Sequence, residues 1–158
     1  MDYAHPEMLI DCQALHQQLE APQLRIFDCA VFLTPSGNGQ YQIDSGHASF
    51  VKAHIPGAGF IDLKQAWADT NSDLNFTLPE VDALQQAIRA SGISAEHDVV
   101  LYSSGHLMWA TRAWWLLHYA GHQRIRILNG NLNAWREAGL PLVAGDSAYP
   151  PASFAATP

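Results

Sequence analysis

The residues best suited to chemistry lie where an apolar segment meets a short polar loop. Residues 99–102 read Val-Val-Leu-Tyr, residues 103–106 read Ser-Ser-Gly-His, and a tryptophan-rich segment predicted to be helical runs from Trp109 to Ala120. In open α/β sheets, ligands and catalytic groups lie in the loops that follow strands, and N–H groups at the start of a helix bind anions. This order predicts an anion-binding loop made of Ser103, Ser104, Gly105, His106, Leu107 and Met108.

The candidate nucleophiles are two serines and two cysteines. Ser103 opens the loop but is a weak nucleophile without a base, and the chain has no G-x-S-x-G elbow and no evident base paired with Ser103 or Ser104, which disfavours a serine hydrolase. Cys29 follows a predicted strand and could lie at the functional edge of the sheet, so a catalytic Cys29 remains an open hypothesis. Most free cysteines, however, are buried and inert, and Cys12 falls on the apolar face of a predicted helix, where we expect it to pack in the core.

Two histidines and one arginine are the remaining candidates on the predicted helix at 109–120. His118 and His122 are four residues apart, but Gly121 predicts that the helix ends between them, so we expect no metal site. Arg112 is a charged residue on an otherwise apolar helix and needs a partner. We expect a structural ion pair with Asp28 or Asp62, in preference to anion binding.

The three tryptophans of this predicted helix point to packing and not to chemistry. Trp109, Trp114 and Trp115 fall on adjacent helical faces, where they would fill the core or an interface with a neighbouring domain.

Composition bounds the classes of protein that fit. A chain of 158 residues with 48% hydrophobic residues is enough for one globular domain. Its formal net charge of −7 disfavours binding to nucleic acid or to an anionic membrane. No apolar run is long enough to span a bilayer, and residues 1–6 lack the order of a signal peptide. Two cysteines indicate no disulfide framework, so we expect a reducing, cytoplasmic location.

Short apolar strands alternate with helices along most of the chain. Asp11 is a predicted cap for the first helix, and Thr77-Leu78-Pro79-Glu80 matches a capping box for a helix that ends at Gly92. The region from Thr34 to Ser45 is polar and contains glycine, so we expect an exposed loop there. Strands are predicted at 24–28, 58–61, 99–102 and 125–128, with further helices at 46–53 and 132–138. This alternation predicts an α/β fold with a central parallel sheet and helices on both faces. From Ala144 onward the composition is typical of a linker.

Several motifs together resemble a rhodanese (sulfurtransferase) domain over roughly residues 8–143. They are Phe27-Asp28, Ala53-His54-Ile55-Pro56-Gly57-Ala58, the strand, loop and helix from Val99, Leu128-Asn129-Gly130-Asn131 with Ala134-Trp135, and Gly139-Leu140-Pro141. Two further segments resemble the N-terminal half of two-domain thiosulfate and 3-mercaptopyruvate sulfurtransferases: Arg112-Ala113-Trp114-Trp115 and Tyr119-Ala120-Gly121-His122. In the mercaptopyruvate branch a histidine is often found about where Phe76 stands, which favours the thiosulfate branch or an untyped relative.

This resemblance implies a division of labour between two domains. It implies that residues 1–143 form a rhodanese-like domain without a cofactor, and that residues 144–158 lead to a second rhodanese domain carrying the catalytic cysteine. Ser103 then stands at a vestigial nucleophile position, and a serine hydroxyl cannot form a persulfide, so we expect this chain alone to be inactive. Asp28, Arg112, Trp109 and Trp115 are the structural or interface candidates. The alternatives are a stand-alone cysteine-less module that binds an anion or a protein, and a sulfurtransferase that uses Cys29.

Overall fold

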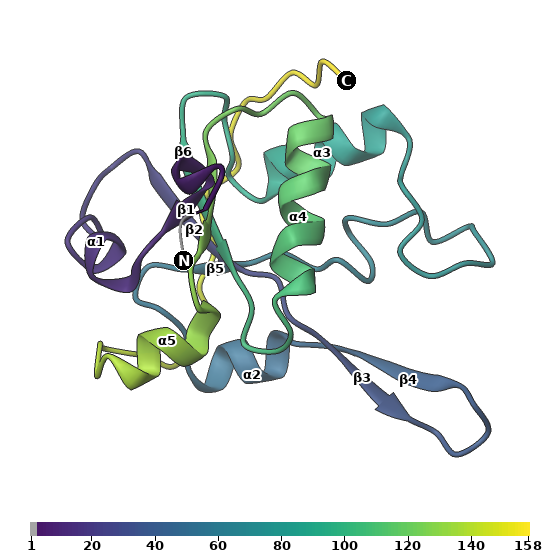
Figure 1. The fold of residues 1–158 in the computed structure, drawn as a ribbon. Helices are drawn as coiled ribbons and strands as arrows, with labels where there is room; N and C mark the ends of the chain where they lie inside the picture. Colours follow the sequence, from purple (N-terminus) through teal and green to yellow (C-terminus); the bar gives the residue numbers. More distant parts are fainter. Residues whose placement is uncertain (1–2) are drawn as a thin grey trace.

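A five-stranded parallel sheet forms the centre of the molecule in the computed structural model, which describes residues 3–158 (Figure 1). The strand order is β1-β7-β6-β2-β5, and β6 pairs with β2 so that Tyr102 lies beside Asp28. The strands are β1 (Leu9–Ile10), β2 (Leu24–Asp28), β5 (Gly59–Phe60), β6 (Asp98–Tyr102) and β7 (Ile125–Leu128). The carboxyl ends of β2 and β6 therefore meet at one edge of the sheet, where the resemblance places the functional loop.

Helices cover both faces of this sheet, as the alternation predicted. They are α1 (Cys12–His16), α2 (His47–Lys52), α3 (Val81–Ala90), α4 (Met108–Tyr119) and α5 (Asn131–Glu137), and a short 3-10 turn (Pro6–Met8) precedes β1. Successive residues of a strand point to opposite faces, so Val99 packs in the core with α3 and α4, whereas Val100 packs in the core with α1, α2 and α5. The predicted α/β class is confirmed.

The stretch predicted as an exposed loop is a β-hairpin that projects from the domain (Figure 1). Strands β3 (Val31–Pro35) and β4 (Tyr41–Ser45) pair antiparallel through a turn in which Gly37 and Gly39 have positive φ. The loop prediction was therefore wrong in conformation, although right in exposure. The hairpin buries little beyond Val31, so its sequence lacks the apolar alternation that normally identifies a strand.

Two predicted helix caps have different outcomes. Asp11 caps α1, because its carboxylate accepts a hydrogen bond from Ala14 N at 2.8 Å. The capping box at Thr77 is wrong: Glu80 is the N-cap of α3, and the Thr77 hydroxyl donates to Leu74 O instead. The residue before a proline is disfavoured in the helical region, so Leu78 does not adopt the helical conformation that a cap at Thr77 requires, and α3 begins at Val81.

The last fifteen residues, whose composition is typical of a linker, run along the domain in close contact with it. Phe154 is only 4% exposed, and its carbonyl accepts a hydrogen bond from Arg89 Nε at 2.7 Å. The Tyr149 hydroxyl accepts a hydrogen bond from Ile26 N on β2 at 3.0 Å. These residues belong to the packed domain, and the division into a domain and a linker to a second domain stays a prediction.

The helices described for residues 3–158 are too short or too polar to cross a bilayer. Met1 and Asp2, with which the signal-peptide argument begins, lie outside the described residues.

Candidate functional site

The loop between β6 and α4 turns at the carboxyl edge of the sheet, close to the base of the β3–β4 hairpin (Figure 1). Gly105 lies against this base, where an added Cβ would be 3.1 Å from the Phe32 ring. The sequence thus correctly predicts a strand, a short loop and then a helix, whereas the role of residues 103–108 as a ligand-binding loop stays a prediction.

Hydrogen bonds inside the chain hold the first half of this loop. Ser103 is fully buried, and its N–H donates to Asn131 Oδ1 at 2.6 Å. The Asn131 amide also donates from Nδ2 to Gly105 O at 2.9 Å, while Gly105 N–H donates to the Ser103 hydroxyl at 3.0 Å. The Ser103 hydroxyl is therefore an acceptor within the loop, and the Asn131 side chain bridges two points of the loop from the start of α5.

Asp28 supports the same loop from the end of β2. Its Oδ1 atom accepts hydrogen bonds from Ser104 N at 3.1 Å and from Ala30 N at 3.0 Å. Its Oδ2 atom and the Ser104 hydroxyl are buried without a hydrogen-bond partner within residues 3–158. Burial raises the pKa of the Asp28 carboxyl to about 6, against the opposing effect of the hydrogen bonds from Ser104 and Ala30. Asp28 is thus a structural support of the loop, and it takes part in none of the ion pairs found within residues 3–158.

The second half of the loop is open to solvent and partly apolar. Leu107 is 38% exposed and Met108 is 40% exposed, at the position where α4 begins. The Met108 N–H donates to Nδ1 of His106 at 3.1 Å, which occupies one backbone donor in the first turn of α4. The exposed part of the loop presents hydrocarbon at Leu107 and Met108, and within residues 3–158 the N–H groups of His106 and Leu107 make no hydrogen bond.

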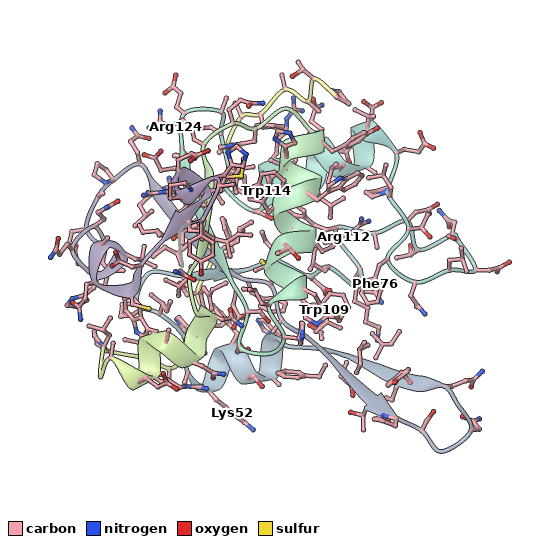
Figure 2. The ribbon with its side chains drawn as sticks, in the orientation of Figure 1. Lys52, Phe76, Trp109, Arg112, Trp114 and Arg124 are labelled. Carbon is pink, nitrogen blue, oxygen red and sulfur yellow. The ribbon has the colours of Figure 1, made fainter. Side chains whose placement is uncertain are left out.

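Arg112 does not form the predicted ion pair. Its Nη2 atom donates to Phe76 O at 2.8 Å, and its guanidinium lies 5.2 Å from the centroid of the Trp115 ring. Figure 2 shows Phe76, Trp109 and Arg112 grouped beside α4. Asp28 is buried under the loop, and the Asp62 carboxylate accepts hydrogen bonds from Lys64 N, so neither acid is the partner. A backbone carbonyl and an aromatic face serve instead, which sequence reasoning could not identify.

The tryptophans of α4 divide between the core and the surface. Trp109 is buried against Phe76, with ring centroids 4.8 Å apart. Trp115 is largely exposed and stacks on Tyr119, while the half-buried Trp114 stacks on His118. Trp109 therefore fills the core as expected, and an interface role for Trp115 stays a prediction.

Neither cysteine is accessible. Cys29 lies in the core with an exposure of 0%, and burial raises the pKa of its thiol well above the usual range. Burial also raises the pKa of the thiol of Cys12, which is the first residue of α1 and packs in the core. A reactive thiol needs an exposed, electropositive setting, and the opposite conditions hold at both sites.

The predicted end of α4 separates the two candidate metal-binding histidines. The helix stops at Tyr119, Gly121 has a φ of +93°, and the His122 ring hydrogen-bonds to Ser94 O. Nowhere in residues 3–158 do three side chains suited to metal binding cluster.

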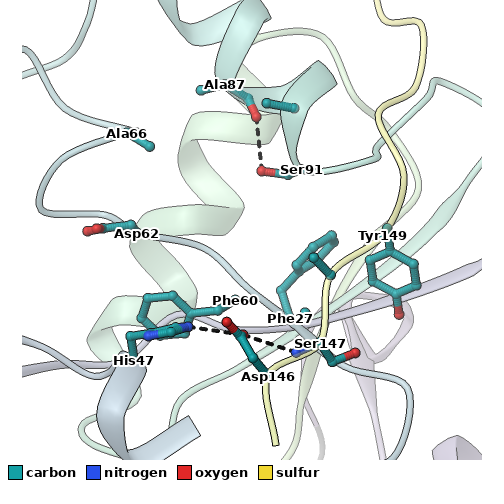
Figure 3. A pocket seen from close by; sticks show the side chains of 13 residues that line it. Phe27, His47, Phe60, Asp62, Ala66, Ala87, Ser91, Asp146, Ser147 and Tyr149 are labelled. Carbon is teal, nitrogen blue, oxygen red and sulfur yellow. Dashed lines mark hydrogen bonds and ion pairs between the residues drawn. The ribbon is translucent and has the colours of Figure 1, made fainter. Parts of the chain in front are cut away.

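A hollow of about 520 Å³ lies away from this loop, between β5, α3 and the C-terminal residues (Figure 3). His47 Nε2 and Asp146 Oδ1 are 3.1 Å apart across its mouth, and Asp146 also accepts from Ser147 N. The Ser91 hydroxyl donates to Ala87 O at 2.9 Å. The sequence did not predict this hollow, which forms only when residues 144–149 return to the sheet. The His47, Asp146 and Ser91 side chains already have hydrogen-bond partners within the chain.

Comparison with known proteins places the chain in a family. The model for the Rhodanese-like domain matches residues 11–138, so the chain belongs to the rhodanese-like domain family. More particularly, it is homologous to halves of two-domain 3-mercaptopyruvate/thiosulfate sulfurtransferases.

Three relatives illustrate the relation. A probable 3-mercaptopyruvate sulfurtransferase of Pseudomonas aeruginosa is 33% identical over 157 residues, covering 95% of this chain and 52% of the relative. The sulfur carrier protein TtuD of Thermus thermophilus is 30% identical over 154 residues, covering 98% of this chain and 48% of the relative. The crystal structure of the 3-mercaptopyruvate sulfurtransferase SseA from Escherichia coli matches with a TM-score of 0.81 at 29% identity. The match covers 95% of this chain and 55% of that chain. The chain thus spans about half the length of these relatives.

Proposed function

We propose that this chain is the non-catalytic half of a two-domain sulfurtransferase, whose partner is a second rhodanese domain bearing the catalytic cysteine. The observation that carries the proposal is the buried Ser103 hydroxyl, which accepts a hydrogen bond from Gly105 N at the position where the resemblance to the rhodanese family puts the nucleophile. The share of each relative that the chain covers, about half, is consistent with this assignment.

The chemistry of sulfur transfer supports an inactive role for this half. A thiolate attacks the outer sulfur of thiosulfate, a new S–S bond forms, and sulfite leaves with the electron pair of the bond that breaks. The persulfide then gives its outer sulfur to an acceptor such as cyanide, and the thiolate is regenerated. A hydroxyl cannot replace the thiolate, and the two thiols of this chain are buried with raised pKa values.

The contribution of this half would be a wall of the partner domain's site. Leu107 and Met108 present apolar side chains at the open edge of a loop that Asn131 and Asp28 hold in place. An apolar wall excludes water from a neighbouring thiolate and strengthens the electrostatic interactions around it. The proposed substrate class is a small anionic sulfur donor such as thiosulfate or 3-mercaptopyruvate.

The first experiment uses the 158-residue chain alone. Incubation with thiosulfate and analysis by intact mass is expected to give no added sulfur, and addition of cyanide is expected to give no thiocyanate. A persulfide that disappears in the Cys29→Ala variant would contradict the proposal and favour the alternative based on Cys29. Reading the gene downstream of Pro158 tests the two-domain arrangement, since an in-frame stop there would favour a stand-alone binding module.

The second experiment uses the polypeptide read from the complete gene. Met108→Asp is expected to lower thiocyanate formation by roughly tenfold or more, because it places a charge beside the thiolate that the wall protects. Met8→Asp is the matched control, since Met8 is 39% exposed but lies in the 3-10 turn before β1. Equal activity of the two variants would remove Met108 from the proposed wall.

A further inference from the structure

The backbone N–H groups of the loop are mostly used within the chain. From Ser103 to Met108, four N–H groups donate internally: those of Ser103, Ser104, Gly105 and Met108. In each case the acceptor is a side-chain atom and not the backbone. An anion in this loop would compete for the same donors.

Two of these acceptors are oxygen atoms of uncharged side chains, those of Ser103 and Asn131. The Ser103 hydroxyl takes the Gly105 N–H, and the Asn131 carbonyl takes the Ser103 N–H at the short distance of 2.6 Å. The other end of the Asn131 amide donates to Gly105 O, which fixes the orientation of the side chain. Asn131 is mostly buried, so water does not compete for these bonds.

The backbone at Asn131 is unusual in a way that this contact explains. Asn131 has a φ of +61° and follows Gly130, whose φ is +81°. A left-handed conformation costs a non-glycine residue energy that the surrounding structure must supply, although asparagine tolerates it better than most. Glycine would fit this position without strain. The two hydrogen bonds to the loop offset the strain.

We propose that Asn131 is a positioning residue that locks the loop. We further propose that its side-chain oxygen Oδ1, together with the Ser103 hydroxyl, takes the place of a bound anion. The loop is then a fixed surface that does not bind small oxyanions such as sulfate or thiosulfate. This lock is a property of the 158-residue chain by itself. A result that contradicts the lock can therefore be told apart from one that contradicts the proposed wall, because the wall is tested by sulfur transfer in the complete protein.

The lock is tested by hydrogen exchange of the loop amides, followed by NMR. Asn131→Gly relieves the backbone strain and removes both side-chain bonds, so exchange at Ser103 and Gly105 is expected to quicken by roughly tenfold. Asn133→Gly makes the same chemical change at an exposed position of α5 and is expected to leave the loop amides unchanged. Equal protection of the loop amides in wild type and Asn131→Gly would overturn the lock.

The anion part is tested by titrating sulfate and thiosulfate while amide chemical shifts are recorded. The wild-type loop amides are expected not to shift, whereas a double variant with Ser103→Ala and Asn131→Gly is expected to show saturable shifts at residues 103–105. Saturable shifts in the wild type would contradict the proposal. A double variant that keeps its dispersed spectrum but binds no anion would equally contradict the claim that the two oxygens occupy an anion's place.

Discussion

Replacement of Asp28 by asparagine is expected to stabilise the domain at neutral pH. The carboxylate is buried, Oδ2 has no partner within the described chain, and the pKa is raised from 3.8 to about 6. Asparagine keeps an oxygen for the N–H groups of Ser104 and Ala30, and its amide can donate to the otherwise unpartnered Ser104 hydroxyl. A neutral side chain also avoids the cost of burying a charge.

The magnitude follows from linkage between ionisation and folding. A raised folded-state pKa means that the unfolded chain releases the Asp28 proton more readily, so the associated stability is fully present below about pH 4. That stability is lost as pH rises through about 6. The rise in the pKa of Asp28 from 3.8 to about 6 corresponds to a loss of about 3 kcal/mol in the free energy of unfolding, at about 1.36 kcal/mol per pH unit. Most of this loss develops between pH 4 and pH 7.

Urea unfolding of the wild type and the Asp28→Asn variant from pH 4 to pH 8 measures this directly. The difference in the free energy of unfolding is expected to move by about 2 kcal/mol in favour of the variant as the pH rises. Asp73→Asn, at an exposed carboxylate, controls for the change in net charge. A difference between wild type and the Asp28 variant that is constant across this range would refute the reasoning, whatever its absolute value.

Three further predictions concern the loop, α4 and the C-terminal residues. Ser103→Cys is expected to fold with a loss of about 1 kcal/mol in the free energy of unfolding, because the larger sulfur is a poor acceptor for Gly105 N–H. The thiol of this variant is expected to resist iodoacetamide in the native state, and rapid alkylation would contradict the buried position. Arg112→Met is expected to cost about 1–2 kcal/mol by leaving Phe76 O without its donor, and an unchanged urea midpoint would show that the contact contributes nothing. Phe154→Ala is expected to cost about 3–5 kcal/mol, as for other buried aromatic residues, whereas a free linker would give no change in the same measurement.

The architecture could be predicted from sequence because its signals are local. Residues 99–102 are buried on both faces of the sheet, which produces the continuous apolar run of a central parallel strand. The polar residues from Ser103 and the tryptophans of α4 follow directly, so the loop and its helix were predicted almost to the residue. The same local logic placed Gly121 at the end of α4, where its φ is +93°.

The parts that the sequence did not reveal depend on contacts between distant segments. Asn131 meets Ser103 across 28 residues of sequence, and no periodicity links them. Arg112 finds a backbone carbonyl at Phe76, and carbonyls carry no residue-specific signal that could identify them beforehand. The C-terminal residues look like a linker in composition, yet Phe154 alone among them provides a large side chain that is almost fully buried.

The energetics of the loop support a function beyond connecting β6 to α4. A simple connection would not need a buried carboxylate with an unpartnered oxygen at Asp28, nor a left-handed asparagine at Asn131, and each feature costs stability. Departures of this kind from local consistency concentrate at functional sites. Since Ser103 cannot carry sulfur, the function that such a costly loop can still serve is to hold an exposed surface in one shape. The exposed surface that it holds is the apolar one at Leu107 and Met108, which is the surface that the proposed partner domain would use.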